Sequence, residues 1–127
     1  IEKITTWLDF VPHEKVPEYI AAINIGTIPF NIRNPTAYYA APNKLWEYLS
    51  QKRLVASTPI PEAIVNRDYI SITRDEQDYE RLFKEYLSEE RNRLDKAIEK
   101  GHSKARQRTW QHSAQKLTNL LITFVRR

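Results

Sequence analysis

The stretch that decides the fold is residues 41–57, APNKLWEYLSQKRLVAS. Pro42 suits the first turn of a helix, where no backbone donor is lost. Leu45 and Leu49 are four residues apart and face one side of that helix. The apolar run at residues 54–56 is then typical of a short buried strand. A helix that leads directly into a buried strand indicates an α/β fold.

The start of this helix suits a phosphate group. The helix N-terminus predicted at Pro42–Lys44 offers free backbone N–H groups after the proline, and these groups and the positive end of the helix dipole both favour an anion there. One turn later, Glu47 lies off the stripe formed by Leu45 and Leu49, where its carboxylate can accept hydrogen bonds from a ribose. The local chemistry therefore predicts a sugar nucleotide, with its phosphates at the helix start and its sugar hydroxyls at Glu47.

Strand and helix patterns alternate on both sides of this stretch. The sequence predicts strands at residues 5–11, 25–29, 54–57 and 69–72, helices at 15–23 and 42–51, and loops at 30–41 and 58–66. Short apolar strands joined by helices predict a parallel sheet with helices on its faces. Such sheets bind ligands at the carboxyl ends of their strands, so the segments after the strands should gather near the helix start at Pro42.

The last third of the chain is predicted to be helical from Glu76 onward. Asp75 is a suitable N-cap, with Asp78 in the capping-box position. Gly101 is predicted to end a helix. We therefore divide the chain into residues 1–100 and a C-terminal helix at 101–127, whose apolar side, with Trp110 among its residues, should pack back on the domain or toward another domain.

Composition limits the classes of protein to consider. The chain has 127 residues, enough for one domain with a modest core. It has no Cys, which excludes disulfides and thiolate metal sites and is compatible with the cytoplasm. No apolar run approaches the roughly 18–20 residues of a membrane span. A net charge of +4 favours ligands that carry phosphate, anionic lipid or nucleic acid.

Three blocks of the chain together resemble the C-terminal part of a GT-B glycosyltransferase. They are FVPHEKVPEYIAAINIGTIPF at residues 10–30, APNKLWEYLSQKRLVASTPIPEAI at 41–64 and RQRTWQHSAQKL at 106–117. The pattern Pro-x-Lys-Leu-x-Glu-Tyr-Leu in the second block is fairly specific. The resemblance implies part of a Rossmann-like parallel sheet with helices on both faces, truncated at its N-terminus and followed by long C-terminal helices. It also implies transfer of a sugar from a nucleotide-sugar donor to an acceptor hydroxyl, in glycan or polysaccharide biosynthesis.

The resemblance also implies where the donor binds. Glu47 matches the second Glu of the family's Glu-x7-Glu motif, which typically binds the ribose. The backbone at Pro42, Asn43 and Lys44 would meet the diphosphate, with Ala41 in the same segment, and the turn at Val11 and Pro12 would lie against the base. The donor is a substrate, and the resemblance implies no metal or other cofactor.

The chain departs from the family pattern at two positions. The first Glu of the motif, which in the family contacts the donor sugar, falls at Tyr39, and the usual small Gly is replaced by Pro42, which removes a phosphate donor. The acceptor-binding N-terminal domain and the basic pair that neutralises the leaving diphosphate are not in the sequence. We therefore expect a fragment that is inactive alone, has that domain as its partner, and carries no catalytic residue of its own.

Other functions stay open at this point. The basic residues of the C-terminal third are typical of a solvated helix surface, and they also suit a stand-alone, non-enzymatic module that binds anionic membrane or nucleic acid. The glycosyltransferase interpretation expects no nucleic acid, and a cytoplasmic protein, free or peripheral on the inner face of the membrane. Sugar-nucleotide epimerisation is a third, weaker interpretation. His13 has no acidic partner in view and is interpreted as a turn residue at a helix start.

Overall fold

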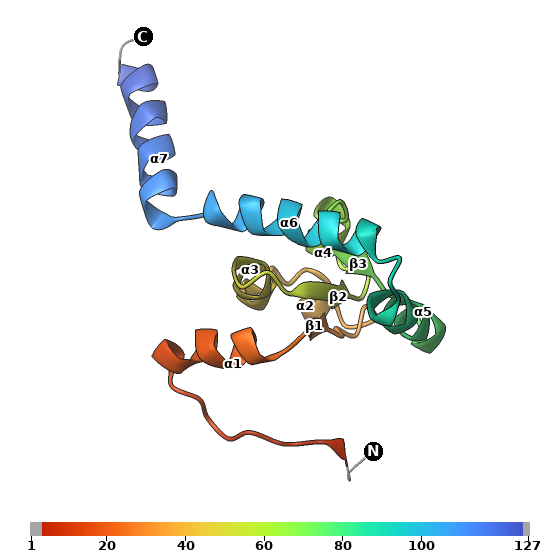
Figure 1. Ribbon diagram of the computed structural model, residues 1–127. Coiled ribbons are helices and arrows are strands. Elements are labelled where there is room, and N and C mark those ends of the chain that lie inside the picture. Colours follow the sequence, from red (N-terminus) through yellow and green to blue (C-terminus); the bar gives the residue numbers. More distant parts are fainter. Residues whose placement is uncertain (1–3, 126–127) are drawn as a thin grey trace.

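The computed structural model describes residues 4–125 and has an α/β architecture with a small parallel sheet (Figure 1). Strands β1 (Ile25–Ile28), β2 (Leu54–Ser57) and β3 (Ser71–Ile72) lie in the order β1-β2-β3. Both pairs are parallel, and the register places Gly26 opposite Val55. The predicted α/β class and the parallel sheet are confirmed.

Helices make up most of the remaining structure. They are the 3-10 turn η2 (His13–Lys15) and the helices α1 (Val16–Ala22), α2 (Pro35–Tyr38), α3 (Asn43–Ser50), α4 (Pro61–Val65), α5 (Glu76–Leu87), α6 (Asn92–Arg106) and α7 (Trp110–Val125). The helices predicted at residues 15–23 and 42–51 are thereby confirmed within one or two residues. The loops predicted at 30–41 and 58–66 hold the short helices α2 and α4.

The strand predicted at residues 5–11 is wrong. This segment forms no strand in the described structure, and Trp7 and Phe10 are 90% and 91% exposed. Its β-branched and aromatic residues have strand propensity, but that propensity stabilises a strand only through pairing and packing against neighbours. Within residues 4–125 no strand pairs with this segment.

Strand β2 is the centre of the core because it is buried on both faces. Val55 packs on one face with residues of β1, α3, α4 and α6, among them Leu49. Leu54 and Ala56 pack on the opposite face with Leu82 of α5 and Leu94 of α6. The uninterrupted apolar run that predicted this strand follows from burial on both faces of a parallel sheet.

Strand β1 approaches α3 very closely at Gly26. A Cβ atom at this position would lie 2.3 Å from Cδ2 and 2.5 Å from Cγ of the Tyr48 ring. Any larger residue would therefore push the ring, and α3 with it, away from the sheet. The φ of Gly26 is not positive, so the backbone conformation alone does not require glycine here. The lack of space for a Cβ atom does.

Helix α6 runs through Gly101 without interruption, so the predicted helix end at this residue is wrong. Gly101 is buried, and a Cβ atom there would lie 2.5 Å from Cδ2 of Leu49. The missing side chain lets α6 pass close to α3, and this close approach explains the glycine. The helical segments end instead near Leu87 and Arg106.

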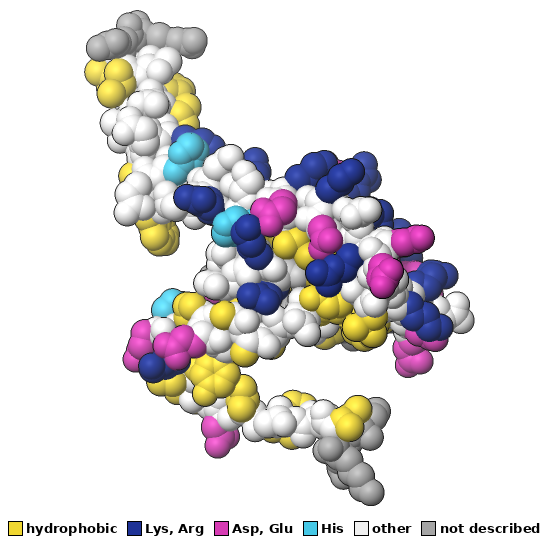
Figure 2. All heavy atoms as spheres, viewed as in Figure 1, with side chains coloured by type: hydrophobic (Ala, Val, Ile, Leu, Met, Phe, Trp, Pro, Cys, Tyr) yellow, Lys and Arg dark blue, Asp and Glu magenta, His cyan; other side chains and the backbone are white. Residues whose placement is uncertain are grey.

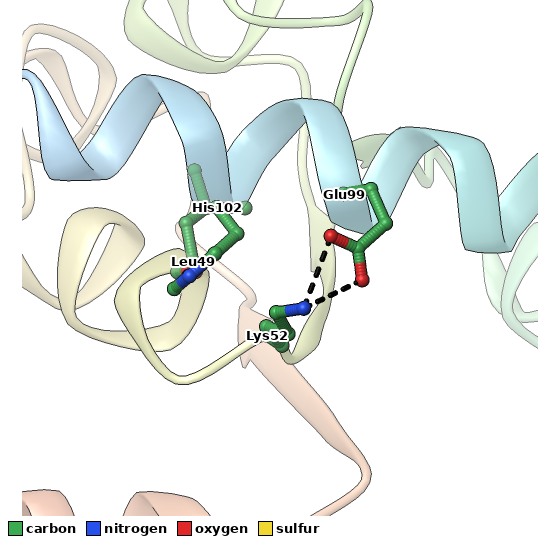
Figure 3. Close-up of polar contacts among 4 residues, drawn as sticks. All are labelled: Leu49, Lys52, Glu99 and His102. Atoms are coloured by element: carbon green, nitrogen blue, oxygen red, sulfur yellow. Dashed lines mark hydrogen bonds and ion pairs between the residues drawn. The ribbon is translucent and has the colours of Figure 1, made fainter.

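Polar contacts reinforce the approach of α6 to α3 (Figure 3). Lys52 Nζ donates to both carboxylate oxygens of Glu99, at 2.8 and 3.1 Å. One turn along α6, His102 Nδ1 lies 3.3 Å from the carbonyl oxygen of Leu49. These contacts fix α6 against the C-terminal end of α3.

Helix α7 extends away from the sheet at the end of α6 (Figure 1). Every described residue of α7 is exposed, including the apolar Leu117 and Phe124. The structure therefore does not place this helix on the core, and packing toward a further domain stays a prediction. Within residues 4–125 no helix is long and apolar enough to cross a membrane.

Candidate functional site

The carboxyl ends of β1 and β2 meet beside the start of α3. The hydroxyl of Thr58, just after β2, donates to the carbonyl oxygen of Ile28 at 3.3 Å, and its N–H donates to the same oxygen at 3.2 Å. Phe30, just after β1, lies under the Lys44 ammonium, with 4.9 Å between Nζ and the ring centroid. The sheet edge and the first turn of α3 therefore form one region, as the parallel topology predicts.

The first turn of α3 keeps free donors. Pro42 is the N-cap in extended conformation rather than a helical residue, and no side chain caps the helix. Within the described residues, the N–H groups of Asn43 and Lys44 have no hydrogen-bond acceptor. Free N–H groups at a helix start can bind an anion.

The Lys44 side chain contacts Phe30. Its ammonium lies over Phe30, and partial burial lowers the pKa of the Lys44 side chain below its usual value. The charged form gains from the ring and loses hydration. Lys44 does not line the cavities beside Glu47 described next.

Glu47 lines two cavities, which share His13 as a second lining residue. A cavity of 210 Å³ separates it from α1, where Val16 and Ile20 are among the lining residues. A cavity of 490 Å³ lies between η2, α3 and the corner that joins α6 to α7. His13 lines both cavities together with Glu47.

The larger cavity combines groups from three parts of the chain. Its lining includes His13 from η2, Asn43, Trp46 and Glu47 from α3, and Arg108, Thr109, Trp110 and Ser113 from the corner between α6 and α7. Within the described residues, the Glu47 carboxylate has no hydrogen bond or ion pair with another side chain. It is thus available to a ligand hydroxyl, beside a guanidinium and the start of a helix.

Arg108 is held at the cavity by two contacts. Its guanidinium carbon lies 4.0 Å from the centroid of the Trp46 ring, and Nη1 lies 3.9 Å from the Glu62 carboxylate. Trp46 in turn packs on Tyr69, with 6.3 Å between ring centroids. Burial raises the pKa of the Tyr69 phenol, and the charge of Arg108 opposes that rise.

The structure brings only some of the predicted site residues together. Asn43 and Glu47 line the same cavity. Tyr39 is 77% exposed and packs edge-on against Tyr38, with 5.0 Å between the ring centroids. The other predicted positions, Val11, Pro12, Ala41 and Pro42, lie outside the lining of both cavities and belong to the segments that lead into η2 and α3.

Sequence reasoning missed the lining residues His13, Trp46, Arg108 and Trp110. His13 directly follows the turn at Pro12 that was assigned to the base, and this adjacency was a usable signal. Arg108 and Trp110 reach the cavity only because α6 crosses α3, which no local pattern predicts. Within residues 4–125 no three His, Asp or Glu side chains are grouped to hold a metal ion.

Comparison with family models, curated proteins and solved structures finds no match to this chain. The resemblance to GT-B glycosyltransferases therefore stays a prediction from the motifs quoted above.

Proposed function

We propose that this chain is the donor-binding part of a GT-B glycosyltransferase, which moves a sugar from a nucleotide-sugar to an acceptor hydroxyl. One observation carries the proposal: Glu47, Asn43 and Arg108 line one cavity of 490 Å³ beside the free start of α3. That volume lies within the range of small-molecule sites, roughly 300–1,000 Å³.

Each of these groups has a role in the proposal. The Glu47 carboxylate accepts hydrogen bonds from the ribose hydroxyls. The free N–H groups of Asn43 and Lys44 and the guanidinium of Arg108 take the diphosphate, whose charge grows as the sugar leaves. Arg108 is suited to this role because its contact with Glu62 is long, at 3.9 Å, and its own side chain is 54% exposed.

The remaining parts of the reaction lie outside this chain in the proposal. The acceptor-binding domain and the basic pair of the family belong to an N-terminal part, so catalysis needs that part. Tyr39 stands where the family has its first Glu, and its exposed ring supplies no carboxylate to the donor sugar. A cytoplasmic location is part of the proposal.

Nucleoside diphosphate titration tests the proposal. Amide chemical shifts are followed by NMR during addition of UDP, GDP or ADP. One of these nucleotides should shift the amide signals of Asn43, Glu47 and Arg108 together. Glu47→Gln should weaken binding by about tenfold, as for loss of a charged hydrogen-bond acceptor. Glu90→Gln removes the same charge at an exposed position between α5 and α6 and should leave affinity unchanged.

Two outcomes would contradict the proposal. Shifts that avoid α3 altogether would place the nucleotide elsewhere. If Glu47→Gln and the Glu90→Gln control bound the nucleoside diphosphate with equal affinity, this would contradict the role of Glu47 in binding the ribose. The alternative of a non-enzymatic module predicts both of these results.

A further inference from the structure

The balance of acidic and basic residues changes sharply near the end of α6. From Lys100 to Arg127 the sequence contains seven Lys and Arg residues and no Asp or Glu. The chain as a whole has 20 basic and 16 acidic residues, so all of its acidic residues lie before Lys100. The C-terminal segment is thus strongly cationic beside a nearly balanced domain.

Helix α7 in this segment has one apolar side. Ala114, Leu117, Leu121 and Phe124 recur at intervals of three and four residues, which puts them on one face of the helix, here called the α7 stripe. Leu117 and Leu121 are each 58% exposed and Phe124 is 77% exposed. Within residues 4–125 no other element covers this stripe, since no described residue of α7 is buried.

The opposite side of α7 carries the polar residues Gln115, Asn119 and Thr123, and Leu120 and Ile122 border it. Gln115 donates to the side chain of Asn119 at 2.9 Å, and Thr123 donates to the Asn119 carbonyl at 2.8 Å. Lys116 lies between these residues in sequence and is exposed. A helix with one apolar side and one polar side can lie flat at a boundary between apolar and aqueous phases.

Cationic side chains continue along the neighbouring helix (Figure 2). Lys96, Lys100, Lys104 and Arg106 of α6 are exposed, and none of them has an ion-pair partner among the described residues. Figure 1 shows α7 standing clear of the sheet, so its stripe is open to an extended surface. Free positive charge next to an open apolar stripe complements anionic lipid headgroups above acyl chains.

We propose that α7 is an interfacial helix that lays the α7 stripe on an anionic lipid bilayer. The occupant is the bilayer surface rather than a second copy, because α7 has 16 residues, about two heptads, while coiled-coil pairing generally needs three or four. Nucleic acid would use the positive charge but would leave the stripe in water. This inference does not rest on the proposed function, and its test contains no nucleotide.

Vesicle flotation tests the inference with the full chain. Phosphatidylcholine vesicles are compared with vesicles that also contain phosphatidylglycerol. The wild-type chain should partition onto the anionic vesicles on the order of tenfold better. Leu117→Glu/Leu121→Glu, which places two carboxylates on the stripe, should lower that partition by at least about tenfold.

A matched variant separates the stripe from charge alone. Gln111→Glu/Gln115→Glu adds the same two charges to the polar side of α7 and should lower partition only a few-fold. Circular dichroism of all variants checks that the helix content is kept. Because the stripe is exposed, neither change disturbs the core.

Three results would overturn the inference. The first is no preference for the anionic vesicles. The second is an equal loss in the two double variants, which would indicate binding by charge alone, as for nucleic acid. The third is a stable dimer in light scattering that Leu117→Glu/Leu121→Glu dissolves, which would make a second copy the occupant of the stripe.

Discussion

The Arg108 guanidinium lies 4.0 Å above the Trp46 ring and so joins the corner between α6 and α7 to the middle of α3. These residues are far apart in sequence, and both line the 490 Å³ cavity that Glu47 also lines. The cavity therefore exists only when α6 is seated on α3.

Replacing Arg108 with Gln should weaken binding of a nucleoside diphosphate by about tenfold, because a charge-assisted contact to phosphate is lost. Stability should change by less than about 1 kcal/mol, since the Arg108 side chain is 54% exposed and its contact with Glu62 is long, at 3.9 Å. Isothermal titration calorimetry measures the affinity. Arg106→Gln, two residues before Arg108 and exposed, is the control, and an equal effect of both variants would speak against a local role for Arg108.

Gly26→Ala should destabilise the fold by about 1–3 kcal/mol, because the new Cβ atom overlaps the Tyr48 ring. Urea unfolding gives the free energy. Thr27→Ala is the matched control, since Thr27 is the next residue of β1 and is exposed, and it should change stability by less than about 0.5 kcal/mol. Adding Tyr48→Ala to Gly26→Ala should cost less than the sum of the single changes, and strict additivity would contradict the overlap.

Lys52→Gly should be more stable than Lys52→Ala by about 1 kcal/mol, because Lys52 has a left-handed backbone with φ of 54°. This residue ends α3 in a Schellman motif: its N–H donates to Leu49 at 3.1 Å and the N–H of Arg53 donates to Tyr48 at 3.0 Å. Both variants lose the ion pair with Glu99, so their difference in thermal unfolding isolates the backbone effect. Equal melting temperatures would contradict it.

Because of Asp78, the free energy of unfolding should fall as the pH is lowered. Hydrogen bonds from the Arg74 N–H and the Arg81 side chain hold the pKa of the Asp78 carboxyl below its ordinary value of 3.8. A lowered folded-state pKa stabilises the fold above the ordinary value, and that contribution is lost as pH falls through the folded-state pKa. Urea unfolding of the wild-type chain and Asp78→Asn should therefore converge as pH is lowered below about 4. A constant difference across that range would exclude this linkage.

Sequence patterns correctly predicted structural features that depend mainly on residues close together in the chain. Leu54, Val55 and Ala56 formed an apolar run that β2 confirms. Asp75 was predicted to cap α5, and its carboxylate accepts from the Asp78 N–H at 2.8 Å. The Asp78 carboxylate, however, accepts from the Arg74 N–H at 2.8 Å, one residue earlier than a capping box requires.

The failures share a physical cause, since each depends on residues distant in sequence. Trp7 and Phe10 have strand propensity but no strand to pair with in the described structure. Gly101 looks like a helix end, yet its role is to let α6 approach Leu49. The same crossing brings Arg108 to Trp46, so Glu47 and Asn43 could be proposed from sequence while the opposite wall of the cavity could not.

The most direct test of the account is a comparison of a ribonucleoside diphosphate with its 2′-deoxy form, using the nucleotide that binds best. Calorimetry measures both ligands with the wild-type chain and with Glu47→Gln. If Glu47 binds the ribose, the deoxy form should bind the wild-type chain about tenfold more weakly, and the two forms should bind Glu47→Gln almost equally. The same ratio of affinities in both proteins would contradict the assignment of the ribose to Glu47.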